Sequence, residues 1–259
     1  MKKGTKICVI LSVILLLSGI AMIAGGVIVG INPDTLVRNI NINTEDIDGK
    51  VMEETFTVSD NKDFIIRAAG VDIEIKNATD GEFGINDSEN IKVWDCKDNE
   101  IRLVTKKRKT GVSKHNKIVV YIPENYKFNK VDIKCGAGNL WIDDNINAEK
   151  MDIECGAGNV EMSDIEVKDA SVECGAGNIY LKGDISGNIK AECGIGNVEL
   201  HVNREKEYYN YSVECALGNI DINDNEYGGF ATERKINNDS DYTMDIECAM
   251  GNVTIQTIN

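Results

Sequence analysis

Apolar and polar residues alternate along most of the chain from about residue 55 onward. In residues 131–135 and 151–155 every second side chain is apolar, which is the period of a half-buried β-strand. The alternation predicts that Ile133, Cys135 and Ala137 share one face of their strand. Similar stretches occur at residues 55–58, 64–67, 71–75, 91–94, 101–104 and 118–122. The pattern predicts an all-β protein.

A five-residue motif, Cys-Gly-Ala-Gly-Asn, occurs three times and is followed by three drifted copies. Its cysteines are Cys135, Cys155, Cys174, Cys193, Cys215 and Cys248. The steps between them are 20, 19, 19, 22 and 33 residues. A step of about 20 residues is typical of a solenoid in which each copy forms one rung. We therefore predict a right-handed parallel β-solenoid. A leucine-rich repeat fits less well, because the asparagine follows the cysteine by four positions.

The chain must turn at the Gly-Asn pair of each copy, because the next short strand has its apolar residues in the opposite parity. The second glycine never changes among the six copies, which predicts a positive φ at that position. These glycines are Gly138, Gly158, Gly177, Gly196, Gly218 and Gly251. The asparagine is equally constant, and stacked amides can form a hydrogen-bonded ladder. The predicted ladder consists of Asn139, Asn159, Asn178, Asn197, Asn219 and Asn252.

Three interpretations of the six cysteines follow from the stacked rungs. The first is a buried column of reduced thiols, since free cysteine is among the most buried residue types. The second is a disulfide between neighbouring rungs, strained because parallel Cβ atoms lie too far apart. The third is a metal site, which needs ligands that converge on a point rather than follow a line.

The N-terminal region predicts one membrane span. Residues 1–6 carry three lysines, and residues 7–31 contain no charge; about 20 apolar residues suffice to cross a bilayer. The lysines place residues 1–6 in the cytoplasm and the rest outside the cell membrane. A cleaved signal peptide is the alternative. Residues 32–54 are predicted to form an acidic juxtamembrane stalk, residues 55–130 an irregular opening β section, and residues 131–259 the repeat solenoid.

The net charge of −15 and a pI near 4.6 disfavour nucleic acid as a partner. Glutamates before five of the six cysteines predict an acidic stripe, which is a solvated face or a loose collector of divalent cations. One basic run, Lys106, Lys107, Arg108 and Lys109, is a solvated turn or a contact for anionic lipids and wall polymers.

Two features near the C-terminus predict contacts. Residues 224–241 read as an insertion that loops out of the solenoid, and its Tyr227, Phe230 and Arg234 are candidate interaction residues. The last rung has no segment after it to cover its edge, which predicts self-association through that rung.

Motifs for catalysis are missing from the sequence. It contains two histidines and lacks a nucleophile elbow, a phosphate loop or a zinc-protease motif. We expect no catalytic residues, no cofactor and no bound metal. A glycan-cleaving β-helical enzyme stays open as a lesser alternative, although regularly repeated carboxylates are typical of structure rather than of a catalytic pair.

Ile-Val-Val-Tyr-Ile-Pro stands at 118–123, followed by Val-Asp-Ile at 131–133 and by the first repeat at 136–142. In these residues the chain resembles a family of bacterial putative adhesins of unknown function. The resemblance implies a β-solenoid head behind an N-terminal membrane helix, and it brings no catalytic or binding residues. The leading prediction is a membrane-anchored, extracytoplasmic, non-catalytic scaffold or adhesin-like module whose partner is an envelope protein or a glycan. The alternative is an envelope-stress or signalling accessory protein.

Overall fold

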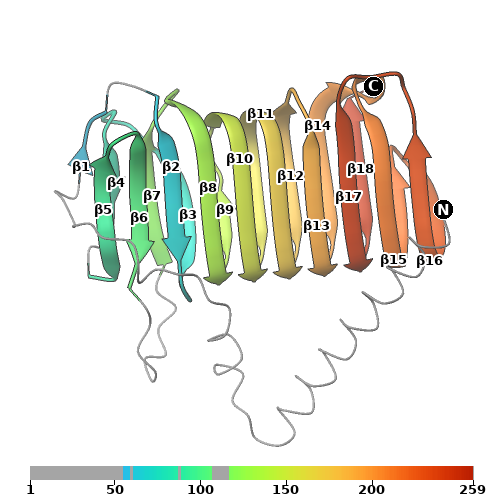
Figure 1. The fold of residues 1–259 in the computed structure, drawn as a ribbon, viewed down its shortest axis with the longest axis horizontal. Helices are drawn as coiled ribbons and strands as arrows, with labels where there is room; N and C mark the ends of the chain where they lie inside the picture. Colours follow the sequence, from blue (N-terminus) through green and yellow to red (C-terminus); the bar gives the residue numbers. More distant parts are fainter. Residues whose placement is uncertain (1–54, 59–60, 87–88, 107–116, 259) are drawn as a thin grey trace, which may run out of the picture.

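The computed structural model describes residues 55–58, 61–86, 89–106 and 117–258. These residues form an all-β molecule of stacked strands (Figure 1), so the predicted fold class is confirmed for this part of the chain. No helix within it is long and apolar enough to cross a bilayer. The predicted cytoplasmic end, membrane helix and stalk, residues 1–54, lie outside the described residues.

The strands of the first half are β1 (Thr55–Phe56), β2 (Asp63–Ala68), β3 (Asp72–Ala78), β4 (Phe83–Ile85), β5 (Ile91–Lys97), β6 (Glu100–Thr105), β7 (Lys117–Pro123), β8 (Lys127–Ala137) and β9 (Leu140–Ile142). Those of the second half are β10 (Ile146–Ala157), β11 (Val160–Ala176), β12 (Ile179–Ile185), β13 (Ile189–Ile195), β14 (Val198–Glu205), β15 (Asn210–Ile222), β16 (Asn225–Ile236), β17 (Thr243–Met250) and β18 (Val253–Ile258), with a short 3₁₀ turn η1 (Lys206–Tyr208) after β14.

Each repeat forms one rung that crosses the molecule in one layer and returns in the other. β8 runs to the Gly138–Asn139 turn, and β9 returns behind it (Figure 1). Neighbouring rungs pair in parallel and in register, with Cys155 opposite both Cys135 and Cys174. This is the stacked, solenoid-like arrangement that the repeat predicts. The right-handed sense of the coil stays a prediction.

The alternating apolar side chains fill the interior, as expected, from the start of each repeat strand to its cysteine. Val131, Ile133 and Cys135 are buried, and the same positions are buried in the following rungs. The predicted inward position of the alanine two residues later is wrong, because Ala137 and Ala157 are half-exposed and Ala176 is exposed. The chain begins to curve around the edge directly after the cysteine, so the two-residue period ends there.

The spatial order of the rungs differs from their order in the chain. The last repeat strand, β17, lies between β13 and β15, and β18 likewise contacts β14 and β15. The expected insertion loop is mostly strand β16, which runs antiparallel to β15. β16 carries the chain to the outer side of β15. The segment after β16 then returns and places β17 between β13 and β15.

The prediction that the last rung is an open edge is therefore wrong. β17 and β18 have hydrogen-bonded neighbours on both sides, and the outermost strand at this end is β16 (Figure 1). The structural argument for self-association through the C-terminal rung, an unpaired strand edge, therefore does not hold.

The opening section contains a rung of the same kind. β2 pairs in parallel with β8, and β3 with β9. β6 and β7 extend the two layers by one further rung. Beyond them the pairing is antiparallel: β5 pairs with β6, β4 with β7, and β1 with β4. Phe64 and Phe128 stack at a centroid distance of 5.2 Å and help to fill this end.

Candidate functional site

The edge where the repeats turn, hereafter the turn edge, is built on one constant glycine in each of the six repeats. The second glycine of each repeat has φ between 125° and 147°. A Cβ atom built on Gly177 would lie 1.9 Å from the carbonyl oxygen of Gly158 in the next rung. Both the backbone conformation and the close stacking require glycine here.

A ladder of asparagines runs along the outside of the turn edge. The amide oxygen of each asparagine accepts a hydrogen bond from the backbone N–H of the next, at 2.9–3.1 Å. The ladder follows the spatial order and ends Asn197, Asn252, Asn219. These side chains are exposed, apart from Asn139, which is half-exposed, so water reaches most of the ladder.

Sequence reasoning missed the carboxylate that begins the ladder. Asp72, in the rung of β2 and β3, accepts from the backbone N–H of Asn139 at 2.7 Å. Its rung lacks both the cysteine and the constant glycine, so only the preceding Ala69-Gly70 hinted at a degenerate copy. A second, shorter ladder joins Asp169 to Asn188 and Asn188 to Thr243 at another corner of the rungs.

The six repeat cysteines form a file of buried, free thiols just inside the turn edge. From the second rung onward each thiol lies near the carbonyl oxygen of the constant glycine in the neighbouring rung. The Sγ atoms of Cys174 and Cys215 lie 3.3 and 3.2 Å from those oxygens. The file continues without sulfur at both ends, where Ala68 stands opposite Cys135 and Thr232 opposite Cys215.

Burial disfavours the thiolate form of every thiol in the file. Burial raises the pKa of Cys135 to about 12. Hydrogen bonds between neighbouring thiols act in both directions: with burial they raise the pKa of Cys155, Cys193 and Cys215, and they lower the pKa of Cys174 and Cys248. Within the described part of the chain, no group of three or more metal-binding side chains converges. Because all six thiols are buried, the file packs the interior of the turn edge.

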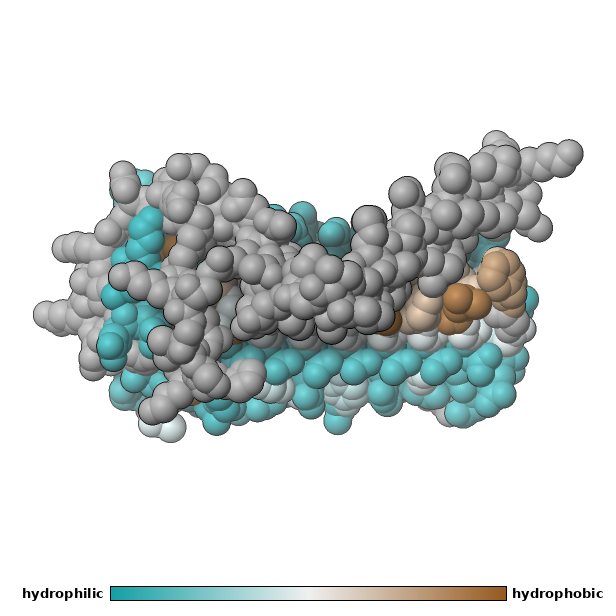
Figure 2. All heavy atoms as spheres, turned by 90° about the horizontal axis from the view of Figure 1, so that it is seen from below, coloured by the Kyte–Doolittle hydropathy of each residue, from teal (hydrophilic) through white to brown (hydrophobic). Residues whose placement is uncertain are grey.

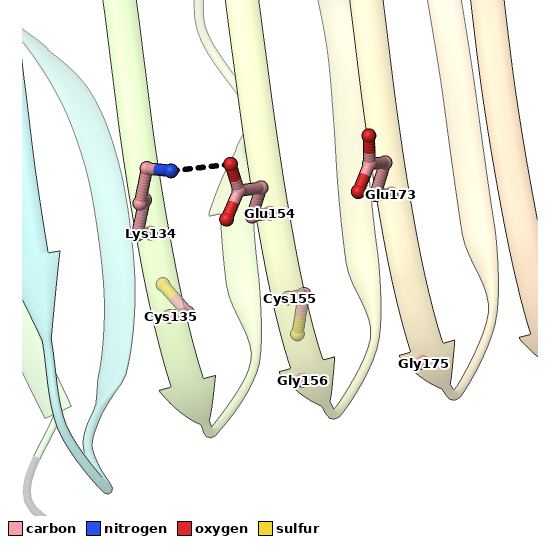
Figure 3. A pocket seen from close by; sticks show the side chains of 7 residues that line it. All are labelled: Lys134, Cys135, Glu154, Cys155, Gly156, Glu173 and Gly175. Carbon is pink, nitrogen blue, oxygen red and sulfur yellow. Dashed lines mark hydrogen bonds and ion pairs between the residues drawn. The ribbon is translucent and has the colours of Figure 1, made fainter. Parts of the chain in front are cut away.

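A shallow groove of about 220 Å³ lies over the first of these rungs (Figure 3). Its charged lining comes from the residues directly before the cysteines: Lys134, Glu154 and Glu173. Lys134 forms an ion pair with Glu154 across the strands. Farther along the same file, burial and the nearby Glu192, Glu214 and Asp245 carboxylates raise the pKa of Glu247.

The remaining predicted contact residues lie at opposite ends of the molecule. Lys106 donates from Nζ to the Glu89 carbonyl oxygen at 2.6 Å, whereas residues 107–109 lie outside the described structure. On β16, the Arg234 guanidinium lies 4.5 Å from the centre of the Tyr227 ring. Phe230 on the same strand is 69% exposed.

Sequence comparison places the chain in a family. The sequence profile described as Toastrack DUF4097 matches residues 37–256. The chain belongs to this family. No curated protein sequence matches it.

Two solved structures resemble this Toastrack domain. One is a putative cell adhesion protein from Clostridium sporogenes, 17% identical, with a TM-score of 0.47 over 79% of this chain and 98% of that one. The other is a putative adhesin from Bacteroides fragilis, 18% identical, with a TM-score of 0.42 over 79% of this chain and 95% of that one.

One surface of the Toastrack domain carries a row of side chains that sequence reasoning did not single out. Trp141, Glu161, Tyr180 and Glu199 stand opposite one another on β9, β11, β12 and β14. We call this set the aromatic–acidic row. Trp141 and Tyr180 are half-exposed, whereas Glu161 and Glu199 are exposed. The sequence contains a signal for this row, because each residue is the second, outward-facing position of the strand that follows Gly-Asn.

Neighbouring side chains hold both ends of the aromatic–acidic row. The Lys117 ammonium lies 5.5 Å from the centre of the Trp141 ring, and its Nζ also lies 2.8 Å from Glu74 Oε2. Burial alone would raise the pKa of Glu74, but Lys117 and Lys76 bring it below its usual value. At the other end, Nε2 of His201 lies 2.6 Å from Glu199 Oε1.

Proposed function

We propose that this chain is a membrane-anchored, non-catalytic adhesion module whose contact surface is the aromatic–acidic row. The observation that carries the proposal is the spacing of the two rings. Trp141 and Tyr180 are separated by one intervening strand position, Glu161, so their backbones lie about 10 Å apart. The rings sit on a sheet that is hydrogen-bonded on both sides, which keeps the spacing constant.

This arrangement suits an extended glycan. The faces of pyranose rings carry C–H groups that pack on aromatic side chains, and their hydroxyls donate to carboxylates. Two rings about two strands apart match the repeat of a linear polysaccharide, in which every second sugar presents the same face. Glu161 and Glu199 then accept hydroxyl hydrogen bonds beside the rings.

Anchoring and the absence of catalysis are parts of the same proposal. Residues 7–31 form the single span, and residues 55–259 face outward from the cell membrane. The carboxylates of the described faces recur in regular files, which is what a repeated structure produces without any reacting centre.

The test is binding of the full-length chain, in detergent micelles, to an array of bacterial envelope glycans. We expect Trp141→Ala and Tyr180→Ala each to lower the affinity at least about tenfold, the size expected when a well-packed aromatic contact is lost. Tyr121→Ala is the matched control, because Tyr121 is 36% exposed but lies outside the row.

The outcomes separate the candidate functions. Glycan binding that persists in both row variants would contradict the proposed site. Capture of a membrane protein without any glycan binding would favour the envelope-stress or signalling accessory. Turnover of a bound glycan that is lost on changing one glutamate would favour an enzyme.

A further inference from the structure

A file of apolar side chains runs along the turn edge at exposed positions. It consists of the residue two places after each repeat cysteine and ends on β16; in spatial order its members are Ala137, Ala157, Ala176, Ile195, Met250, Leu217 and Phe230. We call it the apolar file. Its side chains are half-exposed or exposed, and their size increases toward β16. Figure 2, which views this edge, shows hydrophobic surface gathered at the β15–β17 end.

The turn edge is also free of charge within the six repeats. Each repeat contributes only glycine or alanine, an apolar residue, glycine and asparagine after its cysteine. The chain as a whole carries a net charge of −15. Two copies of so acidic a chain repel one another, and an edge without ionisable side chains offers them a surface for contact without juxtaposed like charges.

We infer that two copies of this chain pair along the apolar file, antiparallel, about a two-fold axis that passes beside Ile195. The inference rests on the order of sizes along the file. Ile195 is the fourth of seven members, with three alanines on one side of it and three larger side chains on the other. An antiparallel pairing places Phe230 against Ala137, Leu217 against Ala157 and Met250 against Ala176 of the partner. Each of these three larger side chains meets an alanine, and Ile195 meets its own copy at the axis, which is the self-complementarity that a two-fold interface requires.

The contact is small. Seven neighbouring strands span about 30 Å, and a strip one turn wide buries a few hundred Å² per copy, below the roughly 800 Å² of a standard interface. The dimer is therefore weak and concentration-dependent. The exposed asparagine ladder beside the file supplies amides that can bond across the rim of the contact.

The experiment measures the molecular mass of the full-length chain in detergent micelles by analytical ultracentrifugation over a range of concentrations. Wild type is expected to dimerise at the high end of that range. Ile195→Glu and Ile195→Lys each place like charges together at the axis, and each should raise the dissociation constant at least tenfold. An equimolar mixture of the two should recover dimers, because opposite charges then meet.

Controls keep the result specific to this pairing. Ile258→Glu changes another exposed apolar residue, 51% exposed, outside the file, and should leave the dissociation constant unchanged. Ala157→Trp should weaken the dimer by colliding with Leu217 of the partner subunit, whereas an edge that is merely sticky would associate more strongly. Circular dichroism checks that each variant is folded.

Three results would overturn the inference. They are a wild-type chain that is monomeric at every concentration, association that the Ile195 variants leave unchanged, and a mixture that fails to recover dimers.

Discussion

At the scale of single residues, the turn edge depends on two residue types for different physical reasons. Glycine is required where a positive φ coincides with a carbonyl oxygen from the next rung, as at Gly177. Asparagine is required because one amide can accept from the rung on one side and donate to the rung on the other. The first requirement concerns space, and the second concerns hydrogen bonding at an exposed position.

Changing the two glycines of one repeat should give very different losses of stability. Gly177→Val should lower the free energy of unfolding by about 3 kcal/mol or more, because backbone strain and a steric clash act together. Gly175→Ala should cost about 1 kcal/mol, since its φ is ordinary and only the Gly156 oxygen, 2.6 Å from the added Cβ, must move. The equivalent residues of two other rungs are Ala216 and Ala249. Urea denaturation measures both; equal midpoints would contradict the turn geometry.

Removing one amide from the ladder should have a moderate effect. Asn178→Ala removes an acceptor for the Asn197 N–H and a donor to Asn159. Because water reaches this position, we expect a cost of about 1 kcal/mol, at the low end of the range for a lost hydrogen bond. Asn178→Asp keeps the acceptor, as Asp72 does at the start of the ladder, and should retain part of the stability. A larger loss for aspartate than for alanine would exclude the acceptor role.

At the scale of the strand, equivalent side chains of neighbouring rungs stand in files. The stability of a charge in such a file depends on the charges of the side chains beside it. Glu74 on β3 has Lys117 and Lys76 within 3.3 Å, so its charge is stabilised. Glu247 on β17 lies between Glu192 and Glu214, so its charge is destabilised. The pKa of Glu74 is lowered and that of Glu247 is raised.

These opposite shifts predict opposite responses to pH. A lowered folded-state pKa adds stability above the unfolded value near 4.5, and this stability is lost as the pH falls below it. Glu74→Gln should therefore destabilise the domain at pH 7 and flatten the loss on acidification. A raised pKa subtracts stability at neutral pH, so Glu247→Gln should stabilise it there. Urea midpoints between pH 7 and pH 3 test both signs; the same sign for both variants would contradict the assignment.

The file of thiols should be chemically silent in the folded protein. The six repeat cysteines are at most 3% exposed, and burial raises the pKa of Cys135 to about 12. Because a reagent must reach the sulfur atom before it can react, we expect a chromogenic disulfide reagent at pH 8 to label these thiols only as fast as the protein unfolds. In urea all eight cysteines of the chain should react. Rapid labelling of several thiols before unfolding would contradict the buried file.

At the scale of the whole molecule, the sequence predicts the features that recur in every repeat. It does not predict features that occur only once, such as the spatial order of the rungs. The alternation, the constant glycine and the constant asparagine are enough to predict stacked β rungs and a ladder at the turn. They contain no information on which rung is next to which, because the six repeats present nearly identical edges. The position of β17 between β13 and β15 depends on β16 and on the length of the return segment.

The same distinction explains the errors at the surface. Ala137 was expected inside, because a two-residue period cannot show where a strand starts to curve. Asp72 and the aromatic–acidic row were missed because they vary between rungs, and sequence repetition draws attention to constant positions. The contact surfaces proposed for this Toastrack domain consist of such varying residues, from Trp141 and Tyr180 to the graded apolar file.

The order of the rungs is the central claim, since the ladder, the thiol file and the apolar file all follow it. Through-hydrogen-bond couplings in the NMR spectrum of the deuterated full-length chain in micelles measure it directly. We predict a coupling from the Gly196 N–H to the Met250 carbonyl and another from the Gly251 N–H to the Leu217 carbonyl, bonds of 2.9 Å in the structure. A coupling from the Gly196 N–H to the Leu217 carbonyl would instead mean that the rungs stack in chain order, and it would contradict this account.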